Sequence, residues 1–343
     1  MKKSLIIALG AIALVACTKT SVSYEQTGEI GFAPVVRKNS TKAAVEGVAM
    51  PGDAILKVYG YYDANTAAGK TWSEGRFSDY LKGVEFAKKA DKSWGGSPNP
   101  YYWPKSGSIL FAAYTPASYS GVSHGVEATT GVDYFKVENA AQVTDFSNSV
   151  DLLYANFVKS AFNAVVPMTF SHAFSWITIE ANDGNLADGA TTPNFRIKSI
   201  TFKGLVKEAK SDKLPEWTAN ATAGKGDFVI FNSDEAVGKD VKKDFAEFAN
   251  AEKSVFFFPQ DLNNDDATLE IMYSMNKGNG DFVDQLFSAK FKTFTSGSPA
   301  ETVTEWKPGK HYIYQVTFGR NEILIEPKLS GWDDVNMTGV PIK

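Results

Sequence analysis

Short apolar runs separated by polar clusters make up most of this chain. Residues 175–181 (SWITIEA) alternate apolar and polar positions with the two-residue period of a half-buried strand. Gly, Pro, Asn and Asp gather between the runs, and such clusters are typical of turns. The pattern predicts strands at residues 29–36, 54–63, 83–86, 108–114, 133–137, 151–155, 165–172, 175–181, 195–202, 227–231, 254–258, 267–274, 286–295, 311–318 and 322–327.

Helical periodicity is scarce. Only residues 237–251 suggest one or two amphipathic turns, with Val241, Phe245 and Phe248 on one side. Many short strands with frequent turn signals indicate β-sandwiches or partly open barrels. We therefore expect an all-β fold. The first series of strands ends near residues 159–165, which predicts an N-terminal sandwich over 29–164 and a C-terminal sandwich over 165–343.

The first residues have the pattern of an export signal. Met1-Lys2-Lys3 is basic, and residues 5–16 form an uncharged apolar run. That run is too short to span a bilayer, which takes about 20 residues, so residues 1–16 are interpreted as a signal peptide. Residues 14–17 (LVAC) resemble a bacterial lipoprotein box, in which Cys17 is the lipidated first residue and residues 17–28 are a tether. The alternative is an ordinary signal peptide with a chance cysteine.

Composition narrows the possible functions. The formal net charge is −4, with three His and one Cys. Nucleic-acid binding normally needs a basic surface, so we expect no nucleic-acid partner. A lone cysteine forms neither an internal disulfide nor a cysteine zinc site. These counts favour a non-enzymatic protein without a cofactor.

Candidate chemical motifs are weak. Residues 68–71 (AGKT) end like a phosphate-binding loop but lack its first glycine. Residues 261–266 (DLNNDD) begin like a calcium loop, yet Asp266 replaces the required glycine and Met272 the required glutamate. An acidic turn is the favoured interpretation there. His172, between Phe170 and Phe174, is interpreted as a core residue.

Two surface features remain. Residues 101–104 (YYWP) would suit a sugar-stacking platform, although a buried aromatic cluster is favoured. Arginine occurs only at positions 37, 76, 196 and 320. Arg37 directly follows the first predicted strand and opens a polar loop, the kind of segment that proteases cut. The alternative is a solvated loop charge.

An ordered set of segments resembles the fimbrillin family, the type V pilins of Gram-negative gut and oral bacteria. The segments are residues 102–104 (YWP), 109–116 (ILFAAYTP), 151–155 (DLLYA), 168–174 (MTFSHAF), 306–318 (WKPGKHYIYQVTF), 323–327 (ILIEP) and 331–332 (GW). The resemblance implies two tandem transthyretin-like β-sandwich domains and export as an outer-membrane lipoprotein. It also implies that an arginine-specific surface protease removes an N-terminal strand, so that the next fimbrial subunit inserts a donor strand.

Carried over to this chain, the resemblance places processing at Arg37 and Lys38. The residues of the displaced strand would be Ile30, Phe32, Val35 and Val36. The donor strand would come from residues 322–343, with Val335, Met337, Val340 and Ile342 as inserting side chains. Gly339 and Pro341 weaken a long final strand there, which leaves stalk, tip and anchor positions open.

The sequence thus predicts a structural fimbrial subunit. Its partners would be other fimbrial subunits, the protease and, before processing, the outer membrane. The alternative is an outer-surface lipoprotein that binds glycans through exposed aromatics such as Tyr101, Tyr102 and Trp103.

Overall fold

The computed structural model describes residues 28–37, 47–63, 78–91, 93–126, 133–146, 149–161, 165–248, 255–278, 280–296, 301–320, 322–330 and 332. The predicted signal peptide, Cys17, Lys38, the loop of residues 68–71 and the candidate donor residues Val335, Met337, Val340 and Ile342 lie outside these ranges. Within the described ranges, no helix has the length and apolar character needed to cross a membrane.

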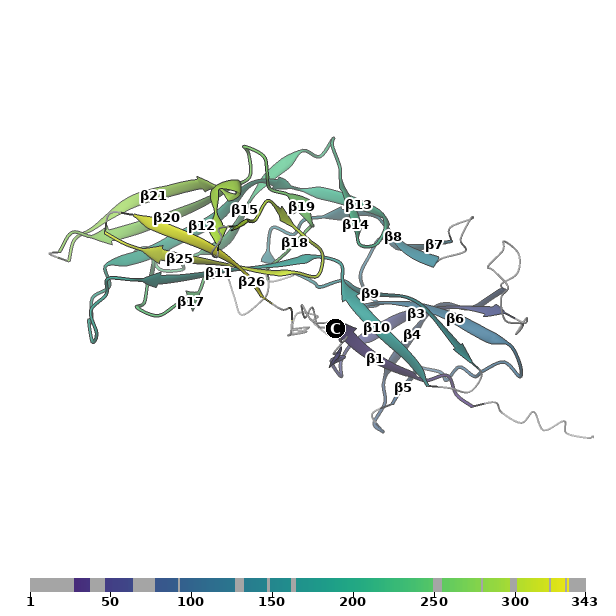
Figure 1. Ribbon diagram of the computed structural model, residues 1–343. Coiled ribbons are helices and arrows are strands. Elements are labelled where there is room, and N and C mark those ends of the chain that lie inside the picture. Colours follow the sequence, from purple (N-terminus) through teal and green to yellow (C-terminus); the bar gives the residue numbers. More distant parts are fainter. Residues whose placement is uncertain are drawn as a thin grey trace, which may run out of the picture.

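Eight strands form the first sheet, in the order β10-β9-β6-β3-β4-β5-β1-β2. Because β1 also pairs with β10, the sheet closes on itself through β1 (Figure 1). The strands are β1 (Phe32–Arg37), β2 (Gly47–Ala49), β3 (Ile55–Asp63), β4 (Ser78–Lys88), β5 (Trp94–Gly96), β6 (Ser108–Thr115), β9 (Leu153–Ala161) and β10 (Val166–His172).

A second, four-stranded sheet packs on this closed sheet and mixes early and late parts of the chain. Its order is β14-β13-β8-β7, from β7 (Val122–Val126), β8 (Asp133–Ala141), β13 (Glu208–Lys213) and β14 (Glu216–Ala219). Tyr114 of β6 and Tyr154 of β9 share a core cluster with Phe135 of β8 and Ala209 of β13. We call the closed sheet and this covering sheet the first lobe.

Two further five-stranded sheets form the second lobe (Figure 1). One contains β17 (Ala246–Glu247), β11 (Ser175–Asp183), β25 (His311–Phe318), β26 (Ile323–Ser330) and β18 (Val255–Phe257); the other contains β15 (Lys225–Asn232), β12 (Phe195–Val206), β20 (Thr268–Asn276), β21 (Phe282–Lys290) and β16 (Lys239–Asp240). Phe202, Phe257, Phe291, Trp306 and Tyr314 are fully buried between them.

The remaining elements are short. They are the pairs β19 (Gln260–Asp261) with β24 (Glu305–Trp306) and β22 (Thr295–Ser296) with β23 (Glu301–Thr302), and the 3-10 turn η2 (Phe291–Thr293). The all-β fold class predicted from the sequence is confirmed. The first sheet continues through β10 to His172, beyond the boundary expected at residue 164.

The helix expected over 237–251 is wrong for the described residues up to 248. This segment forms β16 and β17, which pair with β12 and β11. The Val241 amide donates to Phe195 O at 3.0 Å, and the Phe248 amide donates to Ile179 O at 2.9 Å. Val241 and Phe248 are buried, but Phe245 is 41% exposed. Pairing with β12 and β11 thus satisfies backbone groups of this segment. These tertiary contacts override its local helical periodicity.

Candidate functional site

Strand β1 is the closing element of the first sheet. It runs parallel to β10, from Phe32 opposite Val166 to Val36 opposite Phe170. On its other side it pairs antiparallel with β2 and meets β5 where Phe32 lies opposite Trp94. Removing β1 would therefore separate β10 from β5 and leave both with unpaired backbone groups.

The residues just before β1 are also held by their backbone. The Ile30 amide donates to Tyr101 O at 2.8 Å, and the Trp103 amide donates to Gly28 O at 3.1 Å. Glu29 forms an isolated bridge with Tyr102 and an ion pair with Lys89. The aromatic stretch of residues 101–103 is therefore a backbone partner of the segment leading into β1.

Burial alternates along this segment. Ile30, Phe32 and Val36 are 0%, 3% and 1% exposed, as inward-facing strand positions require. Val35 is only half-buried, and Pro34 occupies the inward position beside it. The sequence does not predict the inward position of Pro34, because an apolar run of Ala, Pro, Val and Val does not reveal which residues face inward.

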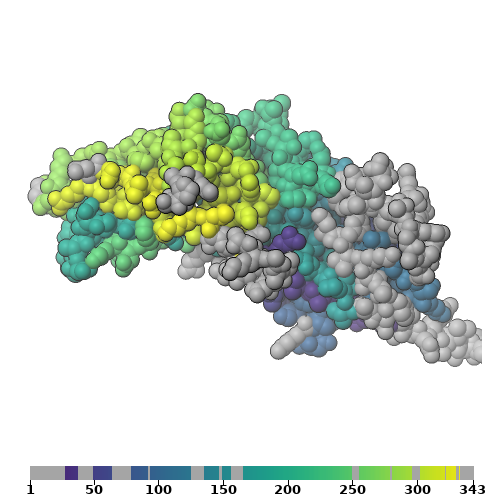
Figure 2. Space-filling model, in the orientation of Figure 1, coloured from purple at the N-terminus to yellow at the C-terminus, as the bar shows by residue number. Residues whose placement is uncertain are grey.

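The predicted processing residue Arg37 ends β1 and is exposed. It borders a recess of about 190 Å³ that is also lined by Tyr154, Ser171, His172 and Gly309. Burial raises the pKa of Tyr154 to about 12, and the positive charge of Arg37 acts in the opposite direction. Part of the purple N-terminal segment is visible at the surface between the lobes in Figure 2.

A buried cluster at the junction of the lobes lies beside this recess. The ring of Trp332, 1% exposed, stacks on His172 with 3.7 Å between centroids, and on Phe256 at 5.4 Å. His172 Nδ1 donates to a carboxylate oxygen of Asp151 over 2.6 Å. His172 is thus a hydrogen-bonded core residue. We call Trp332, His172, Phe256 and Asp151 the seam cluster. No pattern in the sequence indicates that Trp332 joins the lobes.

The aromatics of the glycan-binding alternative do not form an exposed platform. Trp103 is 2% exposed and packs edge-on against Phe111 at 5.7 Å. Tyr101 is half-buried against Phe86. Tyr102 is 36% exposed, but its carbonyl accepts a hydrogen bond from the Tyr80 hydroxyl at 2.5 Å. The interpretation as a buried aromatic cluster is therefore favoured.

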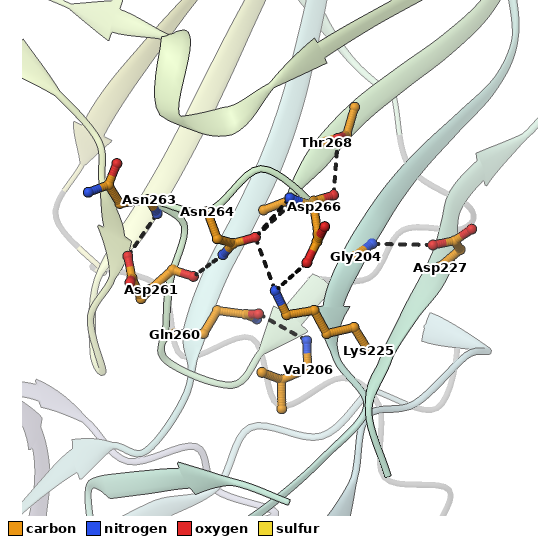
Figure 3. A network of polar contacts seen from close by, with 11 residues as sticks. Gly204, Val206, Lys225, Asp227, Gln260, Asp261, Asn263, Asn264, Asp266 and Thr268 are labelled. Carbon is orange, nitrogen blue, oxygen red and sulfur yellow. Dashed lines mark hydrogen bonds and ion pairs between the residues drawn. The ribbon is translucent and has the colours of Figure 1, made fainter. Parts of the chain in front are cut away.

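Lysines pair with two acidic residues of the calcium-like segment, and Figure 3 shows the pair of Lys225 with Asp266. Lys225 Nζ lies 3.0 Å from Asp266 Oδ2, and Lys290 and Lys292 both contact Asp265. The hydrogen bonds and charges of Lys290 and Lys292 lower the pKa of Asp265 to about 2. Within the described residues, no group of three or more His, Cys, Asp or Glu is arranged to hold a metal ion. The arrangement is that of an ion-paired turn.

Comparison with protein-family models identifies the family of this protein. The fimbrillin-like family model matches residues 41–332, which is most of the chain, so the protein belongs to the fimbrillin-like family. Among curated proteins, none matches the sequence.

Solved structures agree on the fold. A fimbrial protein from Bacteroides vulgatus is 15% identical, with a TM-score of 0.58, and the alignment covers 89% of this chain and 100% of that one. A candidate cell adhesion protein from Bacteroides uniformis is 12% identical, with a TM-score of 0.52, over 89% and 99% of the two chains. At these identities the likeness extends to the fold alone.

Proposed function

We propose that this protein is a structural subunit of a surface fimbria, made as a precursor whose strand β1 occupies the place of a donor strand. The observation that carries the proposal is the position of β1: it closes the first sheet and ends at an exposed arginine. Membership of the fimbrillin-like family supports the fimbrial role.

In this proposal, an arginine-specific surface protease cuts after Arg37. The cut also separates the subunit from Cys17, which would be its lipid anchor in the outer membrane. Departure of β1 takes the Ile30, Phe32 and Val36 side chains out of the first core. A donor strand would then supply both the ladder hydrogen bonds and the inserted side chains. Displacement of β1 would therefore open the groove to a strand from another fimbrial subunit.

Val335, Met337, Val340 and Ile342 are the candidate side chains that this chain would donate to another subunit. A place at the tip or the anchor of the fimbria is compatible with the same proposal. No catalytic role is part of it.

The test is limited proteolysis of the purified precursor with an arginine-specific protease. We expect cleavage after Arg37, seen by intact mass. When the cut protein is mixed with other fimbrial subunits, SDS-resistant or fast-sedimenting assemblies should follow, seen by sedimentation velocity. Arg37→Ala should stay monomeric, whereas the control Arg76→Ala should still be cut at Arg37 and assemble. Unchanged fimbrial assembly in cells that carry Arg37→Ala would rule out the cleavage step.

A further inference from the structure

We propose that the groove left by β1 selects its donor strand through an aromatic side chain at the position of Phe32, and that the donor belongs to a different subunit and not to a copy of this chain. This inference rests on the proposed function and adds the identity of the partner. The subunit contact formed by this donor strand would then connect two unlike subunits.

The site of Phe32 is built for an aromatic ring. Its ring centroid lies 4.8 Å from that of Phe86 and 5.1 Å from that of Phe111, with interplanar angles of 83° and 89°. Both are the edge-to-face geometry that aromatic pairs prefer. Trp103 continues the cluster, edge-on to Phe111. A smaller side chain would lose these contacts and leave a void in a close-packed core.

Strand pairing fixes which residue enters this site. Phe32 lies opposite Val166 of β10 and opposite Trp94 of β5, at the point where β1 bridges the two. A donor that pairs with β10 in the same direction and register must place one side chain there. The other inward positions hold Ile30, Pro34 and Val36 and call only for aliphatic side chains.

The candidate donor segment of this chain lacks the required residue. Residues 333–343 (DDVNMTGVPIK) contain no Phe, Tyr or Trp. If Val335 took the position of Ile30, Met337 would take that of Phe32. Trp332, the only aromatic residue after Phe318, is larger than Phe and is packed in the seam cluster against His172 and Phe256.

Exchange of labelled peptides into the cut protein tests the inference. The protein is cut with an arginine-specific protease in a chain carrying Arg76→Lys, Arg196→Lys and Arg320→Lys, so that Arg37 is the one arginine left in the sequence. A fluorescent peptide of residues 28–37 is then bound and followed by polarisation. Its Phe32→Ala version should bind at least roughly 100-fold more weakly and Phe32→Leu roughly 10-fold more weakly. The control Ala33→Ser, at an exposed position, should bind like the parent.

A peptide of residues 333–343 should bind weakly, and its Met337→Phe version should gain affinity by roughly 10-fold or more. Equal binding by the Phe32→Ala peptide, or tight binding by the native 333–343 peptide, would overturn aromatic selection while leaving strand exchange intact. Failure of the parent 28–37 peptide to enter the cut protein would instead contradict the proposed function.

Discussion

Two histidines outside the seam cluster have neutral rings held against aromatic neighbours. His311 stacks on Trp176 with centroids 3.7 Å apart and has Nε2 2.9 Å from the Thr178 hydroxyl. His124 lies against Tyr59 and Tyr61. Burial lowers the pKa of both rings to about 4, with Asp79 opposing the shift at His124. The folded state therefore resists protonation of these side chains.

Acid should destabilise the protein through these rings. A histidine in an unfolded chain has a pKa of about 6.5, so between about pH 6.5 and pH 4 the unfolded state binds more protons than the folded state. Stability should fall as the pH drops through that window. His311 should account for about 2–3 kcal/mol of the folding free energy that is lost between pH 7 and pH 4.5. Urea unfolding at pH 7 and pH 4.5 measures the difference.

His311→Gln removes one titrating group and should reduce the loss of stability between pH 7 and pH 4.5, even if stability at pH 7 is lower. An unchanged pH dependence in this variant would show that His311 is not the group responsible. His124→Gln provides the same test for the second ring.

The buried residues around β1 show how much of the candidate site can be predicted from the sequence. Ile30, Phe32 and Val36 were expected in the first strand, and all three are buried. Pro34 was missed because parity along a strand depends on its register, which the neighbouring strands set. Trp332 was missed because nothing local distinguishes a tryptophan that joins two lobes from one within a core.

Among the elements, strands with a clear two-residue alternation were predicted well. Residues 311–318 coincide with β25, and 54–63 nearly coincide with β3. The strands that were not predicted are short or polar. In β13 (EAKSDK) the inward residues are Ala209 and Ser211, which give no apolar signal. β13 is a strand because β8 and β14 pair with it on both sides.

The acidic turn between β19 and β20 is organised mainly by Asn264. Its Oδ1 accepts hydrogen bonds from the Asp266 and Ala267 amides at 3.1 and 3.0 Å, and its Nδ2 donates to Asp261 O at 3.0 Å. Gly204 of β12 lies so close that a Cβ would come 2.3 Å from Asp266 O. The turn therefore depends on an asparagine and on a neighbouring glycine.

Asn264→Ala should lower the free energy of unfolding by about 1–2 kcal/mol, because two turn amides lose their acceptor. The matched control is Asn263→Ala, since the Asn263 side chain points away from the network in Figure 3 and should be nearly neutral. Calcium chloride at 1 mM should leave the Tm of the parent protein unchanged. A calcium-dependent rise in Tm, or equal losses in the two variants, would show that the turn is organised differently.

At the scale of the molecule, the pairings between strands that lie far apart in the sequence are the least predictable feature. The β8–β13 ladder joins residues 137–141 to residues 208–211, and the parallel β1–β10 ladder joins residues 32–36 to residues 166–170. Neither pairing leaves a local trace in the sequence. Resemblance to the family implied sandwich domains, but only the strand pairing reveals that β1 closes a sheet.

The seam cluster should couple the stability of the two lobes. Trp332 contacts His172 of the first lobe and Phe256 of the second, whereas Trp306 is equally buried but lies wholly within the second core, donating from Nε1 to the Tyr314 hydroxyl. Both Trp332→Ala and Trp306→Ala should cost about 3–5 kcal/mol. The two variants should differ in which lobe becomes less stable.

Hydrogen exchange measured by mass spectrometry separates the two variants. Trp332→Ala should speed amide exchange on both sides of the seam, in β9 and β10 as well as in β18. Trp306→Ala should speed exchange in the second lobe and leave β9 and β10 as in the parent protein. If the faster exchange caused by Trp332→Ala were confined to one lobe, Trp332 would not couple the stability of the two lobes. Local opening around β1 could then proceed without a response that Trp332 carries to the second lobe.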